Sequence, residues 1–380
     1  MKIGLNFLAL KPFIMNLERY CYFILEGLSR IDQKNEYIVF IPKADTYITS
    51  LKRDNISYVS CPVDYKKSWQ FIVYEQKKLP KMLKEQEIDV LFSPANTSPF
   101  KKKCRQVTAI FDLYPFHQNR MPFDSQRIYS KRKLLDLAKK IDCTVTFSEG
   151  LKKDIVKFLN ISSDKVHVAP LGKSPLFEFK KYLKDTTLIN AIRKEYNIKK
   201  PYIILHNNMD TISNVKVVIS AVARIKKDHQ DLPFQVVCVG NWIRPWNSNK
   251  MLSYLIKKLK CEQDFVFISG VVDRIIAELL YHASLSINPH LYDHFSWTAF
   301  EPMYFDTPVI ASDIPYFREV ASDACLYVDP KSVEDMAKVV WELWNNEILR
   351  TKILRKGQRL LNFLNGEESL KVIHQSIVGG

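Results

Sequence analysis

Glycine and paired cysteines are scarce in this chain of 380 residues. Only 10 glycines occur, and no internal repeat, collagen-like period or sustained heptad is visible, which argues against repeat and fibrous architectures. The seven cysteines are odd in number, and none lies in a Cys-x-x-Cys pair. They therefore indicate neither a disulfide framework nor a zinc site, and we expect reduced thiols in a cytosolic compartment.

Long apolar runs are missing as well. No window approaches the roughly 18 apolar residues of a membrane-spanning helix. The first residues, MKIGLNFLALK, are not followed by a small-residue cleavage site. If a membrane is involved, we expect the protein to lie on its surface.

Basic residues are in excess, with 56 Lys and Arg against 41 Asp and Glu and a formal net charge of +15. Such a charge attracts polyanions, anionic lipid headgroups or phosphorylated substrates, and does not choose among them. Basic stretches in the first half are either solvated faces or contacts with an anionic membrane surface or a lipid-diphosphate-linked glycan. We do not expect nucleic-acid binding, because no recognition motif accompanies the charge. The stretches are Lys101-Lys102-Lys103-Cys104-Arg105, Lys131-Arg132-Lys133 and Lys152-Lys153.

Short apolar runs alternate with stretches of helical periodicity, such as 17–30, along the first half. Such short apolar runs are typical of strands buried in a parallel sheet. The alternation predicts a doubly wound α/β domain. The runs lie at 2–10, 37–42, 90–94, 107–112 and 143–149.

A Lys-rich passage after Gly172 predicts a linker and the first helix of a second domain. Further apolar runs then follow at 202–207, 234–241, 265–270, 285–290 and 307–313. We therefore expect two α/β domains with a cleft between them, where ligands of such proteins usually bind. The boundaries we predict are 1–172 and 173–361, with a last helix at about 362–380 that crosses back to the first domain.

The loop YDHFSWTAFEP, residues 292–302, places two acidic residues among apolar, aromatic and weakly polar neighbours. These residues are Asp293 and Glu301. The following helix is expected to start near Trp297, and the amide groups of a first helical turn lack partners within the helix. A helix start of this kind is suited to binding an anion.

This segment resembles the retaining glycosyltransferases of family 4, which have the two-domain GT-B fold. Their usual run is a proline, then Glu-Gly-Phe-Gly-Leu, a second Glu eight residues after the first, and then Gly-Thr-Pro-Val-Ile-Ala-Ser. Here Asp293 stands at the first Glu position and Glu301 at the second, while Phe295 and Ser296 stand at the Phe and the second Gly. The run TPVIAS at 307–312 matches without change.

The resemblance implies two Rossmann-like domains that face each other across a cleft and bind a nucleotide sugar. Glu301 would accept hydrogen bonds from the ribose hydroxyls, and Asp293 would lie beside the donor sugar. An ionised carboxylate suits the first role, because it accepts only and can hold two vicinal hydroxyls. Without the flanking matches, Glu301 would be read as a helix residue stabilised by the dipole, and Asp293 as an ordinary loop or cap residue.

Weaker matches extend over nearly the whole chain and imply further site residues. With Asp112 on the acceptor side, the candidate catalytic residues are Asp293, Glu301 and Asp112. The other donor-side candidates are Phe295, Ser296 and Trp297 through their amides, Asn208 and Ser213 at the diphosphate, and Gly270 and Val271 at the base. The other acceptor-side candidates are Asn16 and Phe111.

Several family features are missing on the donor side. The Arg and Lys that normally meet the donor phosphates are replaced by Asn208 and Ser213, and His294 and Ser296 stand where glycines are usual. Losing one preorganised donor costs about 10²–10³ in rate, so losing two cations bears directly on turnover. Candidates to replace the missing charge are Lys216, Arg244 and His294.

Two further departures lie in the first domain. Met15-Asn16 replaces a glycine pair that lets the backbone approach the phosphates, and each replacement adds a side chain. Phe111 replaces a His often found before Asp112.

We therefore expect a cytosolic enzyme, either free or peripheral on the cytoplasmic membrane face, that moves a hexosyl unit from a nucleotide sugar to a saccharide, lipid-linked or protein acceptor. Retention of configuration and the absence of any metal or cofactor follow from the resemblance. The alternative is a catalytically inactive relative that binds a glycan, a polypeptide or an active transferase partner.

Overall fold

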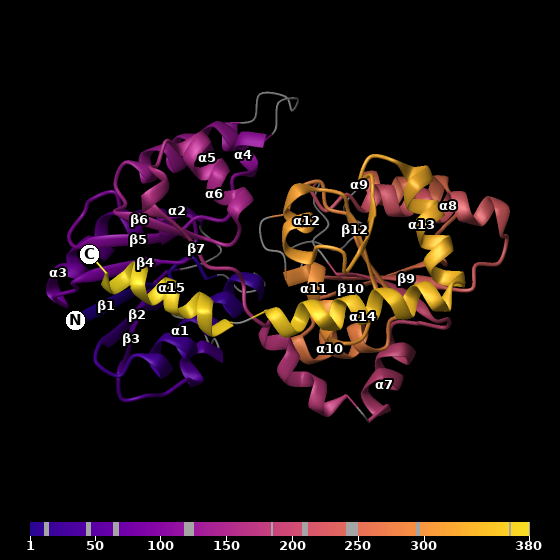
Figure 1. Ribbon diagram of the computed structural model, residues 1–380, viewed down its shortest axis with the longest axis horizontal. Helices are drawn as coiled ribbons and strands as arrows, with labels where there is room; N and C mark the ends of the chain where they lie inside the picture. Colours follow the sequence, from indigo (N-terminus) through magenta and orange to yellow (C-terminus); the bar gives the residue numbers. More distant parts are fainter. Residues whose placement is uncertain are drawn as a thin grey trace. The chain divides into compact units, whose positions relative to one another are not determined.

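A computed structural model of the chain describes residues 1–10, 15–42, 47–63, 68–117, 125–183, 185–206, 212–240, 250–293, 297–364 and 366–379. The chain divides into two units. Unit 1 comprises Met1–Gly172 and Asn365–Gly380, and unit 2 comprises Lys173–Leu364. Both ends of the chain therefore lie in unit 1 (Figure 1).

Unit 1 is built on a parallel sheet whose described strands lie in the order β3-β2-β1-β4-β5-β6-β7. Ile3 on β1, for example, lies beside Tyr37 on β2 and Val90 on β4. The order reverses between β1 and β4, so the carboxyl ends of these strands flank a topological switch point. The strands are β1 (Lys2–Asn6), β2 (Glu36–Pro42), β3 (Ile56–Cys61), β4 (Val90–Ser93), β5 (Arg105–Ala109), β6 (Cys143–Thr146) and β7 (Val166–Val168).

Helices from both ends of the chain complete unit 1. The last helix, α15 (Gly366–Val378), packs against α1 and against strands β4, β6 and β7 (Figure 1). The other helical segments are α1 (Met15–Ile31), η1 (Tyr47–Ser50), α2 (Ser68–Val73), η2 (Tyr74–Lys78), α3 (Leu79–Glu85), α4 (Tyr114–His117), α5 (Ser125–Ala138), α6 (Glu149–Leu159) and η3 (Ser163–Lys165).

Contacts along its whole length hold α15 in unit 1. Leu370 packs on Gly27 of α1 so closely that a Cβ atom at Gly27 would lie 2.3 Å from Leu370 Cδ1. His374 Nε2 lies 2.9 Å from Asp32 Oδ2, which also accepts hydrogen bonds from Asn35 and Tyr37. Burial alone raises the pKa of the Asp32 carboxyl, but the hydrogen bonds from Asn35, His374 and Tyr37 outweigh it and hold the pKa well below 3.8.

Unit 2 repeats the same winding. Its described strands form a parallel sheet in the order β10-β9-β8-β11-β12-β13, which reverses between β8 and β11. The strands are β8 (Tyr202–His206), β9 (Gln235–Gly240), β10 (Phe265–Ser269), β11 (Leu285–Asn288), β12 (Val309–Ser312) and β13 (Leu326–Val328).

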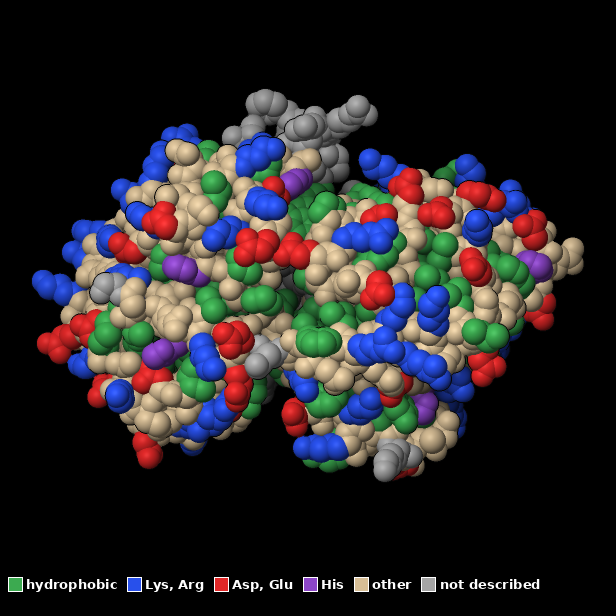
Figure 2. Space-filling view, in the orientation of Figure 1, with side chains coloured by type: hydrophobic (Ala, Val, Ile, Leu, Met, Phe, Trp, Pro, Cys, Tyr) green, Lys and Arg blue, Asp and Glu red, His purple; other side chains and the backbone are tan. Residues whose placement is uncertain are grey.

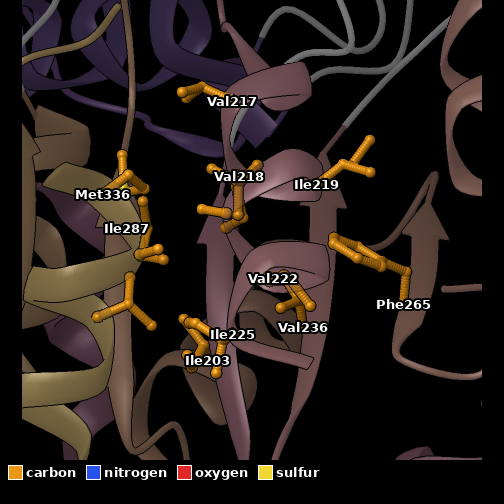
Figure 3. Packing of buried hydrophobic residues seen from close by; sticks show 14 of the residues in the cluster. Ile203, Val217, Val218, Ile219, Val222, Ile225, Val236, Phe265, Ile287 and Met336 are labelled. Carbon is orange, nitrogen blue, oxygen red and sulfur yellow. The ribbon is translucent and has the colours of Figure 1, made fainter. Parts of the chain in front are cut away.

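The core of unit 2 forms where helix α8 lies on this sheet (Figure 3). Val218, Val222 and Ile225 of α8 pack among Ile203 and Ile287 of the strands. β-branched residues are modest helix formers, so burial rather than intrinsic propensity stabilises α8. The helical segments of unit 2 are η4 (Pro175–Tyr182), α7 (Thr187–Glu195), α8 (Val215–Asp228), α9 (Lys250–Lys258), α10 (Asp273–Tyr281), α11 (Trp297–Tyr304), α12 (Pro315–Ala321), α13 (Val333–Asn345) and α14 (Glu347–Phe363).

The prediction of an α/β chain with two doubly wound sheets is confirmed. Each predicted run contains a strand, although the run at 2–10 forms one only over Lys2–Asn6. The strands that the sequence did not predict are β3, β7 and β13, and each lies at the edge of a sheet, where a strand needs less apolar character. The linker passage contains η4 before the first α-helix, α7.

The seven cysteines are free thiols, and all except Cys104 are buried. Within the described residues, no helix combines the length and the apolar character needed to cross a bilayer.

Candidate functional site

The switch point of unit 2 lies between β8, which ends at His206, and β11, which ends at Asn288. Open α/β sheets bind ligands in the crevice at such a point. Helix α11 follows β11 and brings Glu301 back to the end of β8, where His206 Nδ1 lies 3.6 Å from Glu301 Oε2. The predicted start of this helix, near Trp297, is therefore confirmed and places Glu301 at the switch point.

The carboxylate of Glu301 is completely buried. Ser174, the second residue of unit 2, donates a hydrogen bond of 2.5 Å from its Oγ to Glu301 Oε1. Burial, and then the nearby Glu301 charge, raise the pKa of the Tyr304 phenol. Burying a carboxylate costs free energy unless polar groups surround it. A ligand hydroxyl that binds Glu301 would either replace Ser174 at Oε1 or approach Oε2.

Asp293 is also buried, with 6% of its surface exposed. Thr298 in the first turn of α11 donates from Oγ1 to Asp293 Oδ2 at 3.3 Å, and Asn288 donates from Nδ2 to the same Oγ1 at 2.8 Å. His290 Nδ1 lies 3.9 Å from Asp293 Oδ2. These contacts tie Asp293 to the end of β11 and to the first turn of α11, and both predicted acidic residues belong to unit 2.

The TPVIAS run has a structural function at the end of α11. Asp306 adopts a left-handed conformation with φ of 58°, and the Thr307 amide bonds to the carbonyl of Pro302, which ends the helix. Thr307 Oγ1 donates to the carbonyl oxygen of Leu280 at 2.6 Å. The threonine thereby joins the end of α11 to β12 and to α10.

Asn214 was not singled out from the sequence, although it holds several loops at this edge of the sheet. It adopts a left-handed conformation with φ of 51° directly before α8. Its Nδ2 donates to the carbonyl oxygens of Pro289 at 3.1 Å and Pro330 at 2.7 Å. The loops after β11 and β13 are thus tied to the start of α8. Its neighbour Ser213, a predicted diphosphate ligand, is buried with 1% exposure.

The predicted base-binding pair lies just after the edge strand β10. Gly270 has a positive φ of 70°, which favours glycine, and a Cβ there would meet nothing within 4 Å. Val271 is 9% exposed. Open space thus lies beside Gly270, and the assignment of this pair to a nucleotide base stays a prediction.

The remaining predicted donor-side and acceptor-side residues vary in exposure, and several lie outside the described residues. Trp297 is completely buried, and Lys216 is exposed on the first turn of α8. Asn16 is the second residue of α1, although its side chain lies outside what the structure describes. The residues that lie outside the described ranges altogether are Asn208, Arg244, His294, Phe295 and Ser296.

On the predicted acceptor side, Asp112 caps a short helix. The Tyr114 amide donates to Asp112 Oδ1 at 2.9 Å at the start of α4. The Phe111 amide donates to Asn96 Oδ1 at 2.8 Å, and the Phe111 ring stacks on Phe147 with centroids 5.5 Å apart. These contacts give Asp112 and Phe111 defined positions in unit 1, and their roles toward an acceptor stay predictions.

A buried carboxylate, that of Glu75, also occupies the switch point of unit 1. Asn6 at the end of β1 donates from Nδ2 to Glu75 Oε1 at 3.0 Å and to Ser93 Oγ, at the end of β4, at 3.1 Å. Glu75 Oε2 accepts from Thr97 Oγ1 at 2.6 Å and from Gln76 Nε2 at 3.0 Å. Glu75 lies on the π-helical turn η2 and is fully buried. The sequence YEQKK reads as an exposed charged segment, so nothing in it marked this residue.

Two family models match consecutive parts of the chain. The model described as Glycosyltransferase Family 4 matches residues 17–174, and the model described as Glycosyl transferases group 1 matches residues 189–360. Between them they account for most of both units. The chain is a glycosyltransferase of the family 4 type.

Curated relatives of this glycosyltransferase agree with that assignment. The MMP alpha-(1->4)-mannosyltransferase of Mycolicibacterium hassiacum is 27% identical over 226 residues, which are 59% of this chain and 50% of the relative. The O-antigen chain mannosyltransferase RfbU of Salmonella typhimurium is 24% identical over 273 residues, 68% of this chain and 69% of the relative. The match thus spans half the length of the first relative and about two thirds of the second.

Solved structures agree on the fold of the glycosyltransferase. The Anabaena protein HepE, solved in complex with UDP and glucose, matches with a TM-score of 0.74 and 15% identity over 100% of both chains. At this identity the likeness concerns the fold, and the predicted GT-B architecture is confirmed. The roles of individual residues stay predictions.

Proposed function

We propose that this glycosyltransferase moves a hexosyl unit from a nucleotide sugar to a saccharide, lipid-linked or protein acceptor, with retention of configuration. The observation that carries the proposal is the carboxylate of Glu301, which α11 brings to the switch point of the unit 2 sheet. Support also comes from the two mannosyltransferase relatives, which by name transfer a hexose, and from HepE, which was solved with UDP and glucose.

In the proposed reaction, the bond between the anomeric carbon and the diphosphate oxygen breaks while the acceptor oxygen bonds to the same face of that carbon. The acceptor proton passes to the departing diphosphate. Glu301 holds the ribose and Asp293 the donor sugar, and Asp112 lies with the acceptor. The amides at the start of α11 face the diphosphate, because a helix start stabilises negative charge. The proposal involves no resident metal.

Asn208 and Ser213 bear on the rate of this step, because they replace two cations. A hydroxyl or amide donor stabilises a diphosphate less than a charged donor does. We therefore expect turnover to depend strongly on the α11 amides. The mannosyltransferase relatives give no support to the catalytically inactive alternative. A location in the cytoplasm or at its membrane face stays a prediction.

Calorimetric titration with UDP, GDP and their hexose conjugates tests the proposal, first on the wild type and then on Glu301→Gln. Glutamine keeps an oxygen that can accept from Ser174 but loses the charge. Loss of one charge-assisted hydrogen bond to the ribose, about 1.5–3 kcal/mol, should weaken nucleotide affinity about 10- to 150-fold. Transfer is then followed with the ligand that binds, and NMR of the product reports the anomeric configuration.

Glu278→Gln is the matched control, because Glu278 is also a buried glutamate of unit 2 but lies on α10. It should leave nucleotide affinity unchanged. If no nucleotide or nucleotide sugar binds at millimolar concentration, the proposed function is wrong. If a nucleotide binds and Glu301→Gln binds it equally well, the site assignment is wrong.

A further inference from the structure

One face of α14 combines exposed apolar and basic side chains. Their spacings of 4, 3, 4 and 4 residues place them along a single face of this 17-residue helix. They are Ile348, Lys352, Arg355, Arg359 and Phe363. We call this set the α14 face. Figure 2 shows Lys and Arg side chains gathered along the course of α14.

The apolar members stand at the two ends of the α14 face. Ile348 is 85% exposed and Phe363 is 82% exposed, and among the large apolar side chains of the described residues these two are the most exposed. The next is Val272, at 66%. At 1.5 Å per residue the two ends lie about 22 Å apart. Single exposed apolar residues are ordinary, but two that bracket a row of cations on one helix face form a surface with a definite chemistry.

The cations between these ends form no ion pair within the part of the chain that the structure describes. These cations are Lys352, Arg355 and Arg359. Lys356, on the flank, is 2.8 Å from Asp323 and lowers the pKa of that carboxyl, an effect to which Arg359 contributes more weakly. A hollow of about 620 Å³ runs beside the helix and is lined by Ile348, Thr351 and these four basic residues, with Glu347 as its one acidic lining residue. The face therefore offers room and positive charge to small anionic groups.

We propose that the α14 face docks unit 2 on an anionic membrane surface, with the helix axis in the plane of the membrane. The three cations meet lipid phosphates, and Ile348 and Phe363 enter the boundary between headgroups and acyl chains. Clustered basic side chains attract anionic lipids, and large exposed apolar side chains beside them enter the interfacial region of the bilayer. This inference goes beyond the proposed function and does not depend on it.

The α14 face lies directly behind the candidate site. On the opposite side of α14, a Cβ at Gly357 would lie 3.2 Å from Met303 Cγ of α11, so the two helices are in close contact. Gln358 Nε2 donates to Asp306 Oδ1 at 3.1 Å, just after α11. Docking through α14 therefore fixes the orientation of the helix that carries Glu301 relative to the membrane.

Co-sedimentation of the full chain with vesicles tests the proposal. The vesicles are phosphatidylcholine alone or phosphatidylcholine mixed with phosphatidylglycerol. The wild type should bind the anionic vesicles more tightly, and the triple variant Lys352→Gln/Arg355→Gln/Arg359→Gln should bind them about 100-fold more weakly, because each cation near the surface contributes about a fivefold factor. Ile348→Ser/Phe363→Ser should weaken binding at high salt as well, since apolar insertion is not screened.

Lys101→Gln/Arg132→Gln/Lys153→Gln is the matched control. It removes the same charge from exposed positions in the basic stretches of unit 1, and it should lose much less affinity. The proposal is overturned if the wild type does not prefer anionic vesicles, or if this control loses as much affinity as the α14 variant. It is also overturned if duplex DNA binds as tightly as the vesicles and Ile348→Ser/Phe363→Ser has no effect. Transfer by the α14 variant is also measured with a soluble acceptor. If the variant transfers sugar to this acceptor at the wild-type rate but no longer binds vesicles, docking has failed and the proposed function has not.

Discussion

Replacing Gly27 with alanine should destabilise unit 1, although the same change in an ordinary helix interior stabilises by about 0.8–1.0 kcal/mol. The added Cβ would lie 2.3 Å from Cδ1, 2.5 Å from Cδ2 and 2.9 Å from Cγ of Leu370. Because the branch carbon is among these atoms, the whole end of this buried side chain has to move. Overpacking of this kind costs about 1–3 kcal/mol, so we expect a net loss of about 1 kcal/mol.

The sign should reverse when Leu370 is shortened. Leu370→Ala alone removes a side chain that is 2% exposed and should cost about 2–5 kcal/mol. In that background the overlap is gone, so Gly27→Ala should stabilise by about 1 kcal/mol through helix propensity and by filling part of the cavity. The two changes are then coupled by about 2 kcal/mol.

Hydrogen exchange followed by mass spectrometry measures the effect where it arises. Peptides from α1 and α15 should exchange faster in Gly27→Ala than in the wild type. The same peptides should exchange more slowly in the double variant Gly27→Ala/Leu370→Ala than in Leu370→Ala. Peptides from unit 2 serve as the internal reference. Urea unfolding followed by circular dichroism gives the accompanying free energies. If Gly27→Ala stabilises the wild-type chain by about 1 kcal/mol, α15 does not pack on α1 as the structure has it.

Three further changes test polar groups. The pKa of Asp32 is held below 3.8 in the folded state, so the stability that this carboxylate gives the fold is complete above pH 3.8 and is lost as the pH falls below it. The difference in urea midpoint between wild type and Asp32→Asn should therefore shrink below pH 3.8. A difference that stays constant with pH would contradict the contacts of Asp32 with α15. Glu75→Gln should lower the free energy of unfolding in urea by about 1–3 kcal/mol, because the new side-chain amide would face the Gln76 donor across 3.0 Å. The control is Glu85→Gln, at an exposed position on α3, which should cost less than about 0.5 kcal/mol. Asn214→Ala should cost about 1 kcal/mol more than Asn214→Gly in thermal unfolding, because only alanine is strained in the left-handed conformation of this position. Equal losses for the two variants would mean that the effect comes from the two lost hydrogen bonds alone.

The sequence predicted best what depends on short runs of residues. Strands β1, β8 and β11 lie in short runs that are mainly apolar, and the start of α11 follows from the change of pattern after β11. Glu301 was identified by its spacing from Asp293 within a family pattern. Each of these signals lies within a few neighbouring residues, so no knowledge of the tertiary structure is needed to read it.

The rest depends on partners that are distant in the chain. Ser174 meets Glu301 across 127 positions, and Asn6 meets Glu75 across 69. The sequence does not show whether a given serine or glutamate is solvated or buried in a polar network, so these contacts could not be predicted from neighbouring residues. Asn214 is an intermediate case. Asparagine adopts a left-handed conformation more readily than most residues, but directly before a helix it is normally read as an N-cap with an extended backbone.

The place of α15 in unit 1 has a consequence for biosynthesis. The residues of unit 1 up to Gly172 leave the ribosome first, but Gly366–Val378, which covers β4, β6 and β7, is translated after all of unit 2. Domains generally fold as units during synthesis. The second unit, continuous in sequence, is therefore the first to be complete, and the nascent N-terminal sheet stays uncovered on that side until α15 has been translated. Chaperones that bind emerging apolar segments should accordingly be retained longest on the N-terminal half of the chain.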